Sequence, residues 1–138
     1  MTFQLIFSVE GDPVGKQRPR FTKTGRTYTP KKTSDYEALI ASQALSAMCP
    51  AIPLETPVAV YIYINHAIPA SYSKKRKEAC LNRLERPKKI DIDNVCKCVL
   101  DAMNGIVYVD DRQVVSLHAT KRYDTISSVH VCVREELE

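Results

Sequence analysis

The sequence predicts an α+β fold, with a single domain over residues 1–138 and a mixed β-sheet covered by helices in the order β-α-β-α-α-β-β. The length of 138 residues suits one domain. Residues 57–66 alternate in the period-2 pattern of a strand, and residues 95–103 carry apolar side chains at helical spacing. No repeat or linker divides the sequence, so one hydrophobic core is expected.

The first third of the chain predicts a strand, a long loop and a helix. Residues 3–10 (FQLIFSVE) are short and apolar, and a Gly-Asp-Pro turn ends them. A loop rich in Gly, Pro and Thr follows through Pro30, and loops of this length are usually functional or mobile. A helix is expected from Ser34, because Ser34 and Glu37 fit a capping box, and it ends before Pro50.

The middle of the chain predicts a central strand and a basic helix. Residues 57–66 (PVAVYIYINH) are apolar on both faces, which is typical of a strand inside a sheet. Tyr61 and Tyr63 are therefore expected in the core rather than stacked on bases. Ser73 caps a polar, basic helix that reaches about Leu84.

The last third predicts one more helix and two strands. Asp93 or Asn94 caps a helix with a single buried face, formed by Val95, Cys98, Val99, Ala102 and Met103. A short extended piece at 106–109 leads to strands at about 114–123 and 127–135. Packing within the sheet is also the expected role of the three histidines, His66, His118 and His130.

The basic residues are clustered, although the formal net charge is only +4. Residues 11–32 hold seven of the 20 Lys and Arg residues and residues 74–89 hold eight. Such clustering is typical of proteins that bind a polyanion, but two solvated basic faces explain it equally well. If the partner is DNA, the side chains expected to contact it are Lys16, Arg18, Arg20, Lys74 and Lys75.

Other features narrow the class of protein. The chain opens without the pattern of a secretory signal, and no apolar run approaches the roughly 18 residues of a membrane span. The five cysteines form an odd set without a disulfide pattern, so we expect reduced thiols in a cytoplasmic protein. Cys96 and Cys98 form a CxC rather than a CxxC, which argues against zinc.

Five of the sixteen acidic residues lie within residues 91–111: Asp91, Asp93, Asp101, Asp110 and Asp111. Carboxylate oxygens are the ligands that Mg²⁺ prefers, and two or three of them suffice for a site. In an extended backbone, side chains two residues apart project to the same side. The spacing of Asp91 and Asp93 is therefore compatible with a shared cation.

Each of these acids also has an ordinary structural interpretation. Asp93 fits a helix N-cap, and Asp110 with Asp111 fits a turn. Lys97 follows Asp93 by four residues and precedes Asp101 by four, as in a surface ion-pair ladder. The metal-site interpretation gains its weight from the conjunction of these features with two basic segments.

That conjunction resembles the signature of the RusA family of Holliday-junction resolvases. The resemblance lies in three strings, which are Asp91-Ile92-Asp93-Asn94-Val95-Cys96-Lys97, Leu100-Asp101-Ala102 and Val109-Asp110-Asp111-Arg112-Gln113-Val114. Residues 13–21 (PVGKQRPRF) also look like the basic loop of many members. The match spans most of the chain, and the whole string is far more specific than a lone DxD.

The resemblance implies a homodimeric, Mg²⁺-dependent endodeoxyribonuclease that cuts four-way DNA junctions by paired nicks, in recombination and repair. It implies that Asp91, Asp93 and Asp111 are the essential carboxylates and metal ligands, with Lys97 as the active-site lysine. Two alternatives stay open. One is a metal nuclease acting on flaps, forks or RNA, and the other is a DNA-binding protein without enzymatic activity, whose acids are caps and turns.

Overall fold

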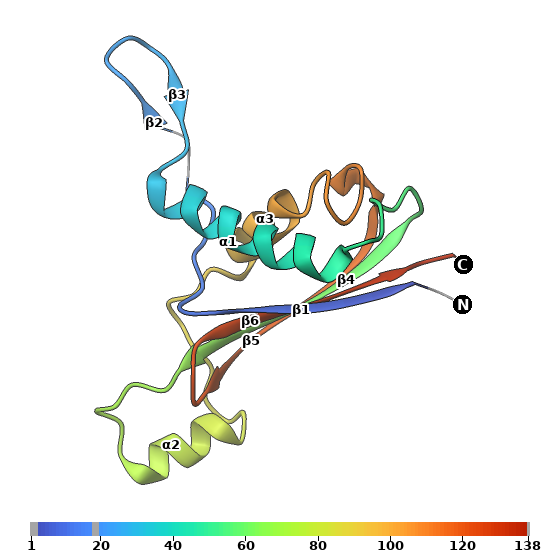
Figure 1. Cartoon of the computed structure of the whole chain (residues 1–138). Coiled ribbons are helices and arrows are strands. Elements are labelled where there is room, and N and C mark those ends of the chain that lie inside the picture. Colours follow the sequence, from blue (N-terminus) through green and yellow to red (C-terminus); the bar gives the residue numbers. More distant parts are fainter. Residues whose placement is uncertain (1–2, 18–19, 138) are drawn as a thin grey trace.

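A mixed four-stranded sheet forms the centre of the computed structural model, which describes residues 3–17 and 20–137. The strand order is β1-β6-β4-β5. Helices α1 and α3 lie together on one side of this sheet, whereas α2 lies apart from both (Figure 1). The bounds are β1 Gln4–Glu10, α1 Lys31–Met48, β4 Val58–Ala67, α2 Lys74–Leu81, α3 Ile92–Ala102, β5 Val114–Asp124 and β6 Ser128–Glu135. The predicted α+β class is confirmed.

Strand β4 lies inside the sheet, as its two apolar faces predict. It pairs in parallel with β5 and antiparallel with β6, and β6 pairs antiparallel with β1. Strands β5 and β6 are consecutive in sequence but are separated by β4. The short connection between them crosses the end of β4, where the amide of Ala67 donates to Ser127 Oγ (2.8 Å) and that of Ile68 donates to the carbonyl of Asp124 (3.1 Å).

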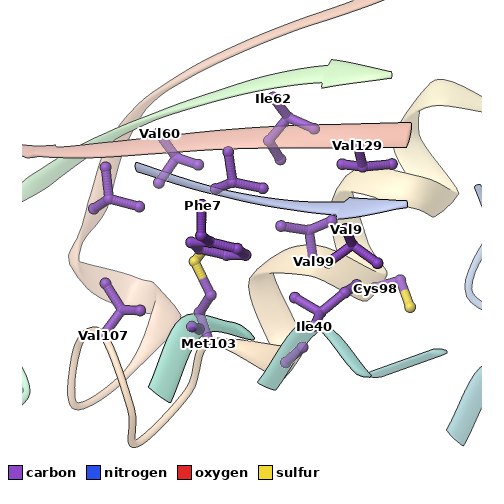
Figure 2. Close-up of a cluster of buried hydrophobic side chains, with 14 of the residues drawn as sticks. Phe7, Val9, Ile40, Val60, Ile62, Cys98, Val99, Met103, Val107 and Val129 are labelled. Carbon is purple, nitrogen blue, oxygen red and sulfur yellow. The ribbon is translucent and has the colours of Figure 1, made fainter. Parts of the chain in front are cut away.

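The core lies between the sheet and the pair α1 and α3 (Figure 2). Strand β1 alternates strictly between exposed and buried residues, so Phe7 and Val9 point toward the helices. The predicted buried face of α3 is confirmed, because all five of its residues are at most 7% exposed. Helix α1 contributes a row at i, i+4 spacing, formed by Tyr36, Ile40, Ala44 and Met48.

Two of the three predicted helix starts are wrong by a few residues, whereas Ser73 caps α2 as predicted and accepts from the amide of Arg76 (3.2 Å). Helix α1 begins at Lys31 with Pro30 as N-cap, and the amide of Ser34 already donates to the carbonyl of Pro30 (3.1 Å). Ser34 therefore lies inside the first turns of the helix and cannot cap it, so the predicted Ser34 capping box is absent. Helix α3 begins at Ile92, with Asp91 rather than Asp93 or Asn94 as N-cap.

Three local predictions also need correction. The loop before α1 contains a small hairpin of β2 (Arg20–Phe21) and β3 (Thr27–Tyr28), whose turn uses Gly25 at φ 83°. Helix α2 ends at Leu81, before Arg83 at φ 64°. Within the predicted extended piece at 106–109, residues 106–107 form a turn in which the amide of Val107 donates to the carbonyl of Met103 (3.0 Å), and only Tyr108 forms β-bridges, with Leu54 and Asn104.

The two tyrosines of β4 are not in the core, contrary to the prediction. They alternate with the buried Val60, Ile62 and Ile64, so they lie on the sheet face opposite α1 and α3. Tyr63 is 37% exposed, and Tyr61 stacks on His118 of β5 with ring centroids 5.0 Å apart. The three histidines do lie in strands β4, β5 and β6. Within the described ranges, no helix is both long and apolar enough to cross a membrane.

The packing of α1 generates a stability prediction. Ile40 is fully buried, whereas Leu45 on the same helix is 60% exposed. We expect Ile40→Ala to lower the free energy of unfolding by about 2–5 kcal/mol, because it removes apolar contacts and leaves a cavity. We expect Leu45→Ala to change it by less than about 0.5 kcal/mol. Urea denaturation followed by circular dichroism measures both, and equal losses would contradict the observed face of α1.

Candidate active site

One face of α3 carries Asp93, Lys97 and Asp101, which follow one another at i, i+4 spacing. These side chains line a cavity of about 500 Å³ together with Asp111 of the short 3₁₀-helix η1 (Asp111–Gln113). Its apolar walls come from both α3 and β5 and are formed by Ile92, Cys96, Leu100, Leu117 and Ala119. The structure thus brings Asp111 into one pocket with Asp93 and Lys97 of α3.

Asp91 lies beside Asp93 at the N-terminus of α3. Its carboxylate accepts a hydrogen bond from Asn94 Nδ2 at 2.7 Å. A hydrogen bond between the two aspartate carboxyl groups raises the pKa of Asp91 and lowers the pKa of Asp93. Asp91 itself lines a neighbouring cavity of about 350 Å³, on the side of α3 that faces Lys16 and Lys89.

The two adjacent acids at 110 and 111 have different surroundings. Asp110 is the N-cap of η1 and accepts from the amide of Arg112 (3.0 Å), a bond that lowers the pKa of Asp110. Gln113 completes a capping box by accepting from the amide of Asp110. Asp111 instead faces the cavity and accepts from Asn104 Nδ2 at 3.3 Å. The geometry therefore favours Asp111 over Asp110 as the functional member.

Lys97 lies in the cavity without an ion pair in the described part of the chain. The ladder considered from the sequence is therefore wrong, because Asp101 pairs with Lys16 instead (3.2 Å). An ammonium group left unpaired beside two carboxylates is available to an anionic ligand such as a phosphodiester. This availability is what an active-site lysine requires.

The comparison with known proteins agrees with this geometry. The sequence profile of the family described as Endodeoxyribonuclease RusA matches residues 10–134. The chain belongs to the RusA family. A protein of Bacillus subtilis (strain 168), named uncharacterized protein YqaN, is similar to it, with 38% identity over 138 residues that cover 95% of this chain and 96% of that protein. The pocket on α3 thus lies in a chain of an endodeoxyribonuclease family.

The carboxylates of this RusA protein fit a hard cation by their chemistry. Asp91 and Asp93 are neighbouring carboxylates, and a bound cation would relieve the repulsion between them when both are ionised. Across residues 3–17 and 20–137, however, no three Asp, Glu, His or Cys side chains lie close enough together to hold a metal ion. The assignment of Asp91, Asp93 and Asp111 as ligands stays a prediction.

An ion-pair network that the sequence did not reveal holds the N-terminal loop against the site. Lys16 Nζ lies 2.5 Å from Glu37 of α1 and 3.2 Å from Asp101 of α3. Burial alone would lower the pKa of Lys16, but the two carboxylates outweigh it and raise that pKa. The amide of Lys16 also donates to the carbonyl of Asn94 (2.9 Å). Lys16, predicted to contact DNA, is therefore engaged within the protein, with its side chain only 20% exposed.

The neighbouring glycine allows this close approach. A Cβ atom on Gly15 would lie 3.1 Å from Cβ of Asn94, tighter than an ordinary contact. No local pattern signals this arrangement, because Lys16 and Glu37 are 21 residues apart in sequence.

The remaining candidates for DNA contact lie elsewhere on the surface. Lys74 and Lys75 form the exposed first turn of α2, and Arg20 is exposed at the base of the hairpin. Arg18 lies outside the described residues. The structure leaves Arg20, Lys74 and Lys75 accessible, and their contact with DNA stays a prediction.

The Lys16 network generates a stability prediction. Lys16→Met leaves Glu37 and Asp101 half-buried and facing each other, so we expect it to lower the free energy of unfolding by about 1–3 kcal/mol at neutral pH. Lys32→Met, at the exposed start of α1, removes the same charge and is expected to change it by less than about 0.5 kcal/mol.

The same prediction has a pH dependence of known sign. A pKa raised by folding stabilises the protein below the unfolded-state pKa, and this contribution disappears as pH rises through the folded-state pKa. The difference in free energy of unfolding between wild type and Lys16→Met should therefore become smaller as pH rises above the ordinary lysine pKa of 10.5. Urea denaturation at neutral and at strongly alkaline pH measures it, and a difference that widened with pH would contradict the network.

Proposed function

We propose that this RusA protein is a Mg²⁺-dependent endodeoxyribonuclease that resolves four-way (Holliday) DNA junctions by paired symmetric nicks, in recombination and repair. The observation that carries the proposal is the pocket on α3. It combines Asp93, Lys97 and Asp111, with Asp91 beside Asp93, in a chain of an endodeoxyribonuclease family.

The proposed chemistry is hydrolysis of a phosphodiester. Asp91, Asp93 and Asp111 would hold Mg²⁺, which polarises the scissile phosphate and lowers the pKa of a bound water molecule. Lys97 would bind a phosphate oxygen and stabilise the negative charge that develops on it during cleavage.

Two copies of the chain would act together. A four-way junction is cut symmetrically when two opposed strands are nicked, and a two-fold symmetric homodimer presents two equivalent active sites for this purpose. The exposed lysines of α2 and the residues around the hairpin would supply affinity for the DNA backbone in the arms of the junction.

The first test concerns the carboxylate at the centre of the site. We expect Asp93→Asn to bind a four-way junction as wild type does but to cleave it at least about 100-fold more slowly, because it loses a charged metal ligand. Asp35→Asn removes the same charge on the exposed surface of α1 and should retain the parental rate. Cleavage of a labelled synthetic junction with Mg²⁺ or EDTA, beside a linear duplex, measures both.

The same assay separates the alternatives. Paired nicks that need Mg²⁺ and Asp93 would support the resolvase. Mg²⁺-dependent cutting of flaps, forks or RNA in preference to the junction would assign another substrate to the same site. Tight DNA binding without cleavage in any divalent metal would favour a non-enzymatic DNA-binding protein, and the acids would then be caps and turns. An Asp93→Asn variant that cuts at the parental rate would reject this active site.

The basic residues of α2 generate a prediction about salt. Removal of one lysine that binds a DNA phosphate should reduce the slope of log affinity against log salt concentration by about 0.9. We therefore expect the double variant Lys74→Ala/Lys75→Ala to bind junction DNA more weakly and with a shallower slope. Arg134→Ala, in β6 and outside both basic segments, should keep the parental slope. Fluorescence anisotropy over a salt series measures the slopes, and an unchanged slope for the double variant would exclude these two lysines.

A further inference from the structure

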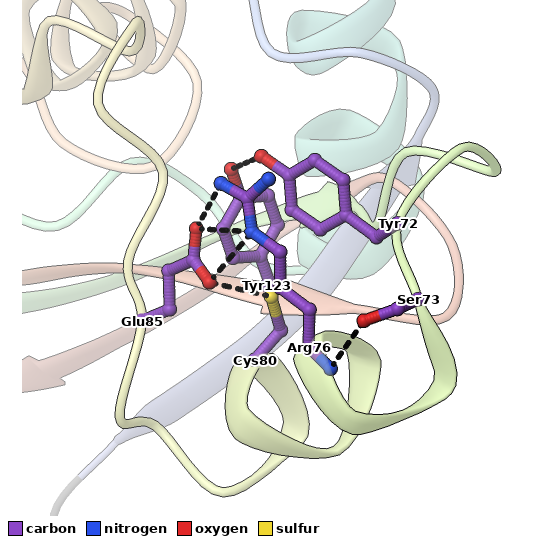
Figure 3. Close-up of polar contacts among 6 residues, drawn as sticks. All are labelled: Tyr72, Ser73, Arg76, Cys80, Glu85 and Tyr123. Carbon is purple, nitrogen blue, oxygen red and sulfur yellow. Dashed lines mark hydrogen bonds and ion pairs between the residues drawn. The ribbon is translucent and has the colours of Figure 1, made fainter.

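A second cavity of about 500 Å³ lies next to the candidate active site. It is formed by α2, by the segment between α2 and α3, and by residues at the ends of β4 and β5. The residues that matter for its chemistry are His66, Tyr72, Arg76, Lys88, Lys89 and Tyr123. Tyr72, Arg76 and Tyr123 lie together with Glu85 beside them (Figure 3), and all four line this cavity. None of these residues has a role in the proposed catalysis.

The aromatic rings of this wall are held in place. The rings of Tyr72 and His66 both meet that of Tyr123 edge to face, with centroids 6.2 Å and 6.1 Å away. Tyr123 is only 7% exposed, and its hydroxyl lies 3.5 Å from that of Tyr72. Arg76 packs over the Tyr72 ring, with its guanidinium carbon 3.5 Å from the centroid. Ordered aromatic surface of this kind is what a nucleobase stacks on.

The positive charge at the cavity is only partly neutralised. Arg76 is paired with Glu85 through hydrogen bonds at 2.6 Å and 3.1 Å. Lys88 and Lys89 also line the cavity, and neither forms an ion pair within residues 3–17 and 20–137. They are exposed, so the cavity offers two ammonium groups to an anion. Aromatic rings beside free lysines match the two parts of a nucleotide, the base and the phosphate.

The position of the cavity relates it to the proposed cleavage. It shares His66, Lys89 and Ile90 with the neighbouring cavity that Asp91 lines. The carbonyl of Ile90 accepts from Lys121 Nζ of β5 at 2.9 Å, which holds the segment between the two cavities against the sheet. The cavity therefore adjoins the one lined by Asp91, one of the proposed metal ligands, so a DNA strand bound at Asp91 would pass close to the aromatic wall.

We infer that this cavity binds one unpaired nucleotide of the DNA strand being cut, with the base against Tyr72 and His66, which the buried Tyr123 holds in place, and the phosphate on Lys88 and Lys89. A base within a duplex is stacked on both faces and paired with its partner, so it cannot enter, whereas an unpaired base at the centre of an opened junction can. This inference rests on the proposed function in one respect, namely that DNA is the ligand. It adds a subsite that selects strands with unpaired bases.

The test uses binding without cleavage. A duplex with a short single-stranded overhang carries the fluorescent base analogue 2-aminopurine in the overhang, and the blunt duplex of the same sequence serves as reference. All measurements contain EDTA, so they do not depend on nuclease activity. We expect wild type to quench the analogue by stacking and to bind the overhang duplex more tightly than the blunt one.

Variants assign the effect to the cavity. Tyr72→Ala should abolish the quenching and weaken binding of the overhang duplex by about 5- to 150-fold, with little change for the blunt duplex. Tyr72→Phe keeps the ring and should keep the quenching. Lys88→Ala should weaken binding of the overhang duplex more than that of the blunt duplex, whereas Lys32→Ala, which lines none of the cavities described above, should affect both duplexes equally. Thermal denaturation shows that each variant is folded.

The outcomes separate this inference from the proposed function. Quenching that depends on Tyr72, in a protein that cleaves no DNA with Mg²⁺, would support the subsite and reject the nuclease. Junction cleavage without quenching would reject the subsite alone. If Lys88→Ala weakened binding of the overhang duplex and of the blunt duplex equally, the inference would also be overturned, since the lysine would then contact the backbone of double-stranded DNA. Binding of a free deoxynucleoside monophosphate without preference for the overhang would overturn the assignment to a DNA strand.

Discussion

The buried face of α3 is the constraint on which the candidate site depends. Val95, Val99 and Met103 pack into the core and set the rotation of the helix about its own axis. With 3.6 residues per turn, that rotation leaves Asp93 and Lys97 on a face that opens to the cavity. A change that turned α3 by one residue would move both groups out of the pocket. The packing of α3 in the core therefore also determines the positions of Asp93 and Lys97 in the site.

Charge is arranged around that helix at three levels of exposure. The pair Asp91 and Asp93 lies at the helix start with a surplus of negative charge, which suits a cation. Lys16 forms ion pairs within the protein, with Glu37 and Asp101, and so joins the N-terminal loop to α1 and α3. The lysines of α2 and of the segment after it stay exposed and suit a polyanion. The modest net charge of +4 hides this separation.

Local sequence patterns predicted the parts of this structure that depend on local physics. The face of α3 and the inner position of β4 follow from hydrophobic periodicity. The Ser34 cap failed because Pro30 begins α1 earlier, and the buried Thr33 hydroxyl bonds with Gln17 in the N-terminal loop. The Lys16 network was not predictable, since its partners meet only after α1 and α3 have packed. For the same reason the sequence named the acids but could not show that Asp93 and Asp111 share a cavity.

The strand order has a consequence for how the molecule is made. Strand β6 follows β1, β4 and β5 in the sequence, yet it occupies an inner position between β1 and β4. Until residues 128–135 have left the ribosome, β1 and β4 each expose an unpaired edge, and β1 has no hydrogen-bonded neighbour in this sheet. Pairing of β1 with β6 must also join residues 118 to 130 positions apart in the sequence, and such long-range pairing is slow. Nascent chains of this protein are therefore expected to depend on chaperones for protection from aggregation until residues 128–135 are available to pair.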